Sequence, residues 1–333
     1  MPLGAWPTPI AAIEIDGRPV WVKDEGASNA TYGGNKVRTL EMWLGHARER
    51  GARRIWAIGA YGSNHVIATA LHARASGFEA GAILFPQPAS TWAAENCGAL
   101  IASGTPIVRV PSVALMPFAA IRIARRDRDA IVMPPGGATP IGTMGALSGA
   151  FELAMQIERG ETPPPARIVV GVGSTCTTSG LVAGVALAHA MGVWPGPLPL
   201  VHGIRVTPWP VTSPTVVVEL VHRTLARIAR LGGPDLRLSR GEIRRRFVID
   251  GRELGRGYGH ATARGDDAAR IFDGLRLDGV YSAKAAAGLL RLHDEGAGPL
   301  VFWASKSRAV LGPPSPDALR GANPRLVRWL AQR

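Results

Sequence analysis

From about residue 53, short apolar segments alternate with amphipathic ones, and this rhythm limits the folds that the chain can adopt. Near-continuous apolar runs are typical of parallel strands that helices cover on both faces. Eight segments fit this description: 55–58, 82–85, 107–110, 131–133, 168–172, 200–206, 247–250 and 300–303. The sequence therefore predicts an α/β fold in which parallel twisted sheets are covered by helices on both faces.

Helices are expected between these strands, because apolar residues recur there at helical spacing. Three sets show it: Val37, Leu40, Leu44 and Ala47; Leu147, Phe151, Ala154 and Met155; and Ala287, Leu290 and His293. In parallel sheets, ligands bind beyond the carboxyl ends of the strands. Segments rich in glycine and small polar residues follow three predicted strands, at 59–64, 135–137 and 171–180. We therefore expect a ligand site where these loops meet.

The formal charge of +13 does not by itself indicate a nucleic-acid partner. Only four of the 38 basic residues are lysine, and the arginines are scattered among alanines over most of the chain. The densest basic clusters, 122–128 and 237–246, lack the interleaved aromatic residues on which a single-strand binder stacks bases. We expect these arginines to lie on solvated helix faces and expect no nucleic-acid partner.

Cys97 and Cys176 are too few for a disulfide framework or a thiolate metal site, which fits a reducing cytoplasm. Residues 1–10 lack the basic start and apolar run of a secretory signal. The closest approach to a membrane span, residues 180–194, is short enough to be a buried core helix. We expect a cytoplasmic protein with no bound metal and no membrane association.

Lys36 is a candidate nucleophile. It follows Gly33 and Gly34, precedes an amphipathic helix, and is one of very few lysines in an arginine-rich chain. A desolvated lysine can lose its proton and form an imine with a carbonyl compound, whereas arginine stays protonated. Taken alone, a lysine at this position would also fit the exposed first turn of a helix.

Residues 173–180 form a candidate anion site, because small residues allow close backbone approach and a helix N-terminus favours negative charge. A phosphate group fits such a loop. An ordinary Ser/Thr helix cap would account for the same composition. The loop is not a nucleotide P-loop, since no Gly-Lys-Ser/Thr ends it, and the Gly-x-Gly-x-x-Gly fingerprint is absent.

Together, the motifs resemble a known enzyme family. They are Gly33-Gly34-Asn35-Lys36-Val37-Arg38-Thr39-Leu40-Glu41, Gly62-Ser63-Asn64-His65, Gly136-Gly137-Ala138, residues 173–180, Gly257-Tyr258-Gly259 and Val280-Tyr281-Ser282-Ala283-Lys284-Ala285. In this order they resemble the 1-aminocyclopropane-1-carboxylate deaminase and D-cysteine desulfhydrase family over nearly the whole chain. The resemblance implies a tryptophan synthase β-like fold, pyridoxal 5′-phosphate as cofactor and a cytoplasmic homodimer.

Two domains are expected from the resemblance. The large cofactor-binding domain would comprise residues 1–38 and 150–333, and a small α/β domain would comprise residues 39–149.

The resemblance also implies roles for individual residues at the cofactor. Lys36 would carry pyridoxal phosphate as an imine, with Asn35 beside it and the Asn64 side chain near the phenolic oxygen. Ser305 would meet the pyridine nitrogen. The cup around the phosphate would be formed by Gly173, Ser174, Thr175, Cys176 and Thr177.

A small amino-acid substrate would meet a second group of residues. Ser63 resembles the catalytic serine at the substrate carboxylate, and Asn64 and His65 would offer it backbone N–H groups. Tyr258 and Tyr281 resemble the two tyrosines that flank the substrate in this family. A buried tyrosine also commonly serves packing alone.

Three positions depart from the family pattern and bear on the substrate. Ser282 stands where the deaminases have Glu, which argues against opening of a cyclopropane ring. The family's His-Thr-Gly-Gly is Ala304-Ser305-Lys306-Ser307 here. Lys306 raises the hypothesis that its ammonium contacts an anionic substrate side chain, although a solvated lysine is the favoured explanation. The phosphate cup is also less glycine-rich than in the family.

The expected reaction is α,β-elimination from a small amino acid, as in the desulfhydrases, with release of ammonia and a 2-oxo acid. Lys36 would act as general base at Cα, and Ser63 would hold the carboxylate. The alternatives are a β-replacement synthase, a ring-opening deaminase and a cofactor-binding relative without activity.

Overall fold

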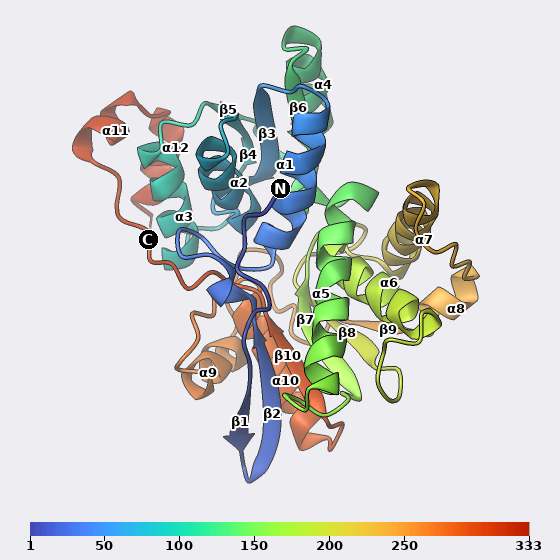
Figure 1. Ribbon diagram of the computed structural model, residues 1–333. Coiled ribbons are helices and arrows are strands. Elements are labelled where there is room, and N and C mark those ends of the chain that lie inside the picture. The colour runs from blue at the N-terminus through green and yellow to red at the C-terminus, as the bar shows by residue number, and fades with distance from the viewer. Residues whose placement is uncertain (333) are drawn as a thin grey trace.

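The computed structural model describes residues 1–332, which form two sheets. The larger has the strand order β1-β2-β10-β7-β8-β9 and the smaller has β5-β4-β3-β6 (Figure 1). β1 and β2 form an antiparallel hairpin, and all other pairs are parallel. The strands are β1 Ile10–Ile15, β2 Arg18–Asp24, β3 Arg54–Ala60, β4 Glu79–Phe85, β5 Ile107–Arg109, β6 Ala130–Met133, β7 Arg167–Val172, β8 Leu200–Arg205, β9 Phe247–Asp250 and β10 Leu300–Ala304.

Helices connect the strands. The α-helices are α1 Lys36–Glu49, α2 Asn64–Ala75, α3 Thr91–Ala102, α4 Met116–Arg126, α5 Pro140–Glu158, α6 Cys176–Ala190, α7 Pro214–Arg230, α8 Arg240–Arg244, α9 Ala263–Ile271, α10 Ser282–Asp294, α11 Pro316–Gly321 and α12 Pro324–Leu330. Three short 3-10 turns, η1 Glu25–Ser28, η2 Val113–Leu115 and η3 Pro135–Gly137, complete the elements. Within residues 1–332, no helix combines the length and apolar character that a membrane crossing needs.

All eight strands expected from the sequence are present, and the α/β class is confirmed. The β1–β2 hairpin was missed. Its first strand carries the short apolar run 10–13, but it lies at the sheet edge, exposes residues on both faces and precedes the alternating segments that begin near residue 53. The Asp16-Gly17 turn was the available signal, since both residues adopt positive φ, at 49° and 71°, as a tight hairpin turn requires.

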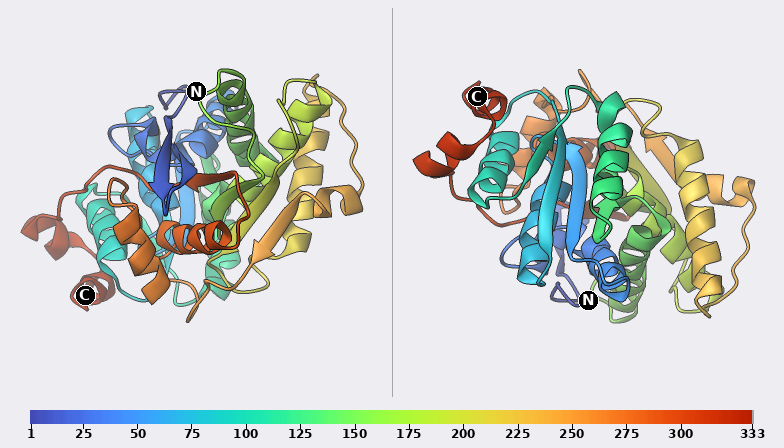
Figure 2. Two further views of the ribbon diagram at one scale, coloured as in Figure 1. Left: turned by 90° about the horizontal axis from the view of Figure 1, so that it is seen from below. Right: turned by 90° about the horizontal axis from the view of Figure 1, so that it is seen from above.

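Helices cover both faces of each sheet (Figure 2). In β7, Ile168 and Val170 pack towards α5, α6 and α7, whereas Val169 packs towards α9 and α10. This alternation follows from the two-residue period of a strand. In β3, Ile55 faces the core beneath α1, α2 and α3, and Trp56 faces the side covered by α4.

The C-terminal helix α12 packs against the four-stranded sheet, although the predicted division assigns its residues to the other domain. Leu326 and Trp329 of α12 join the core of the four-stranded sheet, although they lie far from it in sequence. The division into residues 1–38 plus 150–333 and residues 39–149 stays a prediction.

A buried ionic cluster ties α1 to the larger sheet. Arg38 Nε donates to Glu25 Oε2 at 2.7 Å, and its Nη2 donates to Glu152 Oε1 at 2.9 Å. Lys23, from β2, pairs with the same Glu152 oxygen. All four side chains are at least nine-tenths buried. Burial alone would raise the pKa of Glu152, but Arg38 and Lys23 hold it below its usual value. The cluster is neutral only when complete.

We predict that Glu152→Ala lowers the free energy of unfolding by about 3–5 kcal/mol, because it removes the carboxylate that pairs with Lys23 and leaves the buried cluster with an uncompensated positive charge. Urea unfolding followed by circular dichroism measures the change. The matched control is Glu219→Ala, which breaks the exposed Arg240–Glu219 pair and is expected to cost less than about 1 kcal/mol. Equal losses in the two variants would contradict this assignment.

Candidate active site

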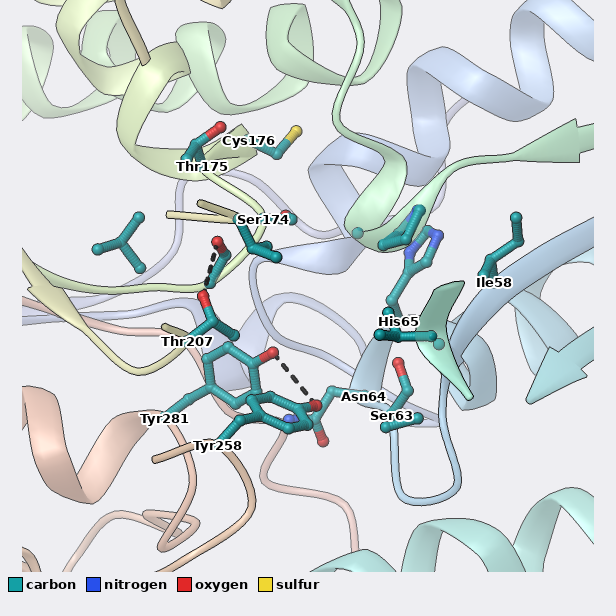
Figure 3. Close-up of a pocket in the computed structure, with 18 of the residues that line it drawn as sticks. Ile58, Ser63, Asn64, His65, Ser174, Thr175, Cys176, Thr207, Tyr258 and Tyr281 are labelled. Atoms are coloured by element: carbon teal, nitrogen blue, oxygen red, sulfur yellow. Dashed lines mark hydrogen bonds between the residues drawn. The ribbon is translucent and has the colours of Figure 1, made fainter. Parts of the chain in front are cut away.

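A cavity of about 550 Å³ opens at the carboxyl ends of β3 and β7. The first residues of α1, α2 and α6 line it together with the strand ends. Figure 3 shows Ser174 and Thr175 on one side of this space, Ser63 and His65 on another, and Tyr258 and Tyr281 below them on a third. The cavity therefore lies where parallel sheets are expected to bind ligands.

Every site residue predicted from the sequence lines this cavity. The set is Asn35, Lys36, Ser63, Asn64, His65, Gly173, Ser174, Thr175, Cys176, Thr177, Tyr258, Tyr281 and Ser305. The fold thus brings together segments that are more than 200 residues apart in the chain. The individual roles of these residues stay predictions.

Lys36 is the first residue of α1, and the two glycines before it explain its placement. Gly34 has a φ of 97°, and a Cβ there would lie 2.6 Å from the carbonyl oxygen of Ser305. Only glycine allows this close approach, which seats the start of α1 against the end of β10. Burial removes water from the Lys36 ammonium and lowers its pKa. The neutral amine that nucleophilic chemistry needs is therefore favoured.

The loop after β7 leaves the N-terminus of α6 open to the cavity. Thr175 occupies the cap position with a φ of 68°, and its side chain caps no backbone N–H of the helix. Within residues 1–332, the Thr175 and Thr178 hydroxyls are buried without a hydrogen-bond partner. Asn35 donates to Thr177 Oγ1 at 2.8 Å and thus links this loop to Lys36. Free N–H groups, the helix dipole and unpartnered hydroxyls suit a phosphate.

Cys176 belongs to this loop, but its thiol points away from it. Its Sγ lies 3.7 Å from Thr143 Oγ1 and 3.8 Å from the Gly137 carbonyl oxygen. Burial raises the pKa of this thiol. Cys176 can therefore offer its backbone N–H to an anion, while the protonated side chain packs into the core.

The start of α2 forms the facing wall. Ser63 caps the helix, with Oγ accepting from Val66 N at 3.3 Å. His65 is 3% exposed, and within residues 1–332 neither of its ring nitrogens has a hydrogen-bond partner. Burial, together with the charge of the nearby Lys36, lowers the pKa of His65 to about 3. The imidazole is therefore neutral at physiological pH.

Tyr258 and Tyr281 stand as a pair in the cavity. Their hydroxyl oxygens are 3.4 Å apart, and their rings meet edge to face at a centroid distance of 5.9 Å. Burial raises the pKa of Tyr258 to about 12 and that of Tyr281 well above its usual value. Both phenols therefore stay protonated near neutral pH and can donate protons or hydrogen bonds.

Two buried charged residues hold the tyrosines in place. Asp278 Oδ1 accepts from the backbone N–H of Tyr281 at 2.8 Å. Lys284 donates to the carbonyl oxygens of Leu254 and Gly257, at 2.8 and 3.1 Å, in the loop that carries Tyr258. Ser282 donates a hydrogen bond to Asp278 and does not line the cavity. This departure from the family pattern therefore lies behind the cavity wall and not in it.

The hypothesis that Lys306 meets an anionic substrate side chain is wrong for this structure. Lys306 is 5% exposed and is not among the residues that line the cavity, whereas its neighbour Ser305 is. Its Nζ donates to Tyr32 Oη at 3.2 Å and to Asn64 Oδ1 at 2.9 Å, behind the wall. Its side chain is directed inwards because these two acceptors replace water around the ammonium.

The apolar rim of the cavity was not predicted from the sequence. Phe85, Val113, Met116 and Val211 line it and come from β4, η2, α4 and the segment between β8 and α7. Their sequences carry no motif, and only the tertiary fold brings them together.

The residues present fit pyridoxal phosphate. An uncapped helix N-terminus with unpartnered hydroxyls suits its phosphate, and a lysine with a lowered pKa in the same cavity suits its aldehyde. The Asn35 to Thr177 hydrogen bond joins the two subsites. Fold and site therefore define an α/β enzyme with one lysine-centred cofactor pocket.

Comparison with known proteins agrees. Residues 1–304 match the family model described as pyridoxal-phosphate dependent enzyme. The chain is 33% identical to a nocardicin C-9′ epimerase of Nocardia uniformis subsp. tsuyamanensis, over 96% of this chain and 97% of that protein. It is 29% identical to a D-cysteine desulfhydrase of Salmonella paratyphi A, over 89% and 90%. A crystal structure of an ACC deaminase homologue has 26% identity and a TM-score of 0.75, covering 93% and 92% of the two chains.

The chain belongs to the family of pyridoxal-phosphate-dependent enzymes. The predicted cofactor, the fold and the resemblance to the deaminases and desulfhydrases are thereby confirmed.

We predict that the His65 ring does not titrate between pH 5 and pH 8, because its pKa of about 3 lies well below this range. Histidine ring resonances in NMR spectra recorded across this range measure it, and His65→Gln assigns the signal. A His65 midpoint inside the range would contradict the proposed burial of a neutral imidazole.

Proposed function

We propose that this enzyme catalyses α,β-elimination on a small amino acid, with Lys36 as cofactor anchor and general base, and releases ammonia and a 2-oxo acid. The proposal rests on Lys36, which has a lowered pKa and lines the same cavity as the open N-terminus of α6. An amine in this state can both attach to the cofactor and accept a proton from Cα.

Bound pyridoxal phosphate supplies an electron sink for negative charge at Cα of an attached amino acid. The protein orients the reactants. The hydroxyl of Thr175 and the N–H groups at the start of α6 hold the phosphate. Ser63 and the N–H groups of Asn64 and His65 hold the substrate carboxylate at the start of α2, where the helix dipole favours an anion. Ser305 would offer a neutral hydroxyl, not a carboxylate, to the ring nitrogen.

Proton transfer is divided between two sides of the cavity. Lys36 takes the proton from Cα, because its pKa is lowered. Tyr258 and Tyr281 remain protonated, since their pKa values are raised, and one of them can donate a proton to the leaving group. This division of acid and base matches what an elimination requires.

Epimerisation at Cα is a second candidate. A relative at 33% identity over nearly the whole chain is named as an epimerase. The same first step, removal of the Cα proton by Lys36, serves both reactions. In epimerisation a different proton, supplied by a donor on the opposite side such as one of the protonated tyrosines, is then added to the other face of Cα. The apolar rim at Phe85, Val113, Met116 and Val211 supports a substrate with an apolar substituent in either case.

One experiment separates these reactions. The purified enzyme is incubated in D₂O with separate D- and L-amino acids that carry a β leaving group and with others that do not. Proton NMR follows the Cα–H signal and 2-oxo acid, an ammonia assay runs alongside, and chiral chromatography analyses the remaining amino acid. Lys36→Ala is the matched control and is expected to lose Cα exchange.

Elimination predicts equal amounts of ammonia and 2-oxo acid, only from substrates with a leaving group. Epimerisation predicts deuterium at Cα and the opposite configuration, without ammonia. A protein that binds the cofactor but exchanges no Cα proton with any substrate would contradict both and favour an inactive relative.

We further propose a homodimer in the cytoplasm, divided into domains at residues 1–38 plus 150–333 and 39–149. The family resemblance supports the dimer and the division. Cys97 and Cys176, both buried and free, are consistent with a reducing compartment.

A further inference from the structure

The Asn64 side chain is held by three hydrogen-bond donors from behind the cavity wall. Its Oδ1 accepts from Lys306 Nζ at 2.9 Å, Tyr32 Oη at 2.8 Å and Asn96 Nδ2 at 2.8 Å. Tyr32, Asn96 and Lys306 are 1%, 3% and 5% exposed. Tyr32, Asn96 and Lys306 have no role in the set that the family resemblance implies, and of the four residues only Asn64 lines the cavity.

The cluster leaves one orientation for the Asn64 amide. A lysine ammonium has three donors and no acceptor, so the atom that faces Lys306 must be the amide oxygen. Asn96 is oriented in the same way, because its Nδ2 also donates to the Gly62 carbonyl oxygen at 2.9 Å. The Asn64 amide nitrogen is therefore directed away from the cluster, on the side of the cavity.

Lys306 places its amino group beside two hydrogen-bond acceptors, which favour the charged form of the amine. Its direct partners are a phenol and an amide, and its Nζ lies 5.4 Å from the Tyr32 ring centroid and 5.8 Å from that of Trp92. Burial lowers the pKa of Lys306, and the charges of Asp278 and Glu95 oppose this effect. Arg276 also acts on it, but Arg276 is paired with Glu95 at 2.9 Å.

We propose that Lys306 is a positioning residue which, with Tyr32 and Asn96, orients Asn64 so that its amide nitrogen donates to the phenolic oxygen of the cofactor. The inference rests on the proposed attachment of pyridoxal phosphate at Lys36. The ammonium polarises the Asn64 amide, which strengthens the hydrogen bond that the amide nitrogen donates. Lys306 thus stabilises negative charge on the cofactor without touching it.

The proposal has a measurable consequence in the visible spectrum. Stabilising the anionic phenolic oxygen favours the deprotonated form of the Lys36 linkage and lowers the pH at which the visible band changes. The other titratable side chains that act on Lys36 or lie beside it are His65 and Cys176, and neither changes charge near neutral pH. Removing the Lys306 charge should therefore shift the midpoint upwards.

We expect Lys306→Met to raise the midpoint of the visible pH titration by about one unit. Tyr32→Phe keeps the ammonium and removes one donor, so a smaller upward shift is expected. Arg325→Met removes an exposed positive charge on α12 and is expected to leave the midpoint unchanged. Circular dichroism and thermal unfolding confirm that each variant is folded before titration.

An unchanged midpoint in folded Lys306→Met would overturn the inference. If that variant does not fold, an unchanged midpoint in Tyr32→Phe overturns it. Failure of the proposed function would look different: the wild-type protein itself, supplied with pyridoxal phosphate, would show no visible band. A shift of the same size in Arg325→Met would assign the effect to overall charge and would also overturn the inference.

Discussion

The active site depends on the buried ionic cluster of Lys23, Glu25, Arg38 and Glu152. Arg38 lies two residues after Lys36 on α1, and its two carboxylate partners belong to η1 and α5. The cluster therefore fixes the position and rotation of α1 relative to the larger sheet. Together with the close contact of Gly34 with Ser305, this anchor places the first residue of α1 in the cavity. Buried pairs of this kind contribute little net stability, but they are costly to break.

A second constraint is the control of charge inside the cavity. Desolvation favours the neutral forms of Lys36, His65 and the two tyrosines, whereas the start of α6 stays open to an anion. The site thus separates a phosphate subsite from a nearly uncharged reaction space. Acid and base functions can coexist there at one pH, because the amine and the phenols are shifted in opposite directions.

Much of the fold and site could be predicted from the sequence, for identifiable reasons. Buried parallel strands leave continuous apolar runs, and glycine-rich loops mark their ends. Lys36 and Ser63 stood in recognisable motifs, so they could be assigned to one site before the fold was known. The β1–β2 hairpin lies outside the alternating segments, and the cluster around Lys306 joins four separate segments with no shared sequence pattern. The direction of a buried lysine side chain depends on tertiary contacts, which explains the failed hypothesis about Lys306.

The central claim is that Lys36 anchors pyridoxal phosphate. Borohydride reduction of the cofactor-loaded protein, followed by proteolysis and mass spectrometry, tests it most directly. We predict a single modified peptide with the phosphopyridoxyl group on Lys36, and none on the buried Lys23, Lys284 or Lys306. A label on another lysine, or a colourless protein that takes up no cofactor, would contradict this account.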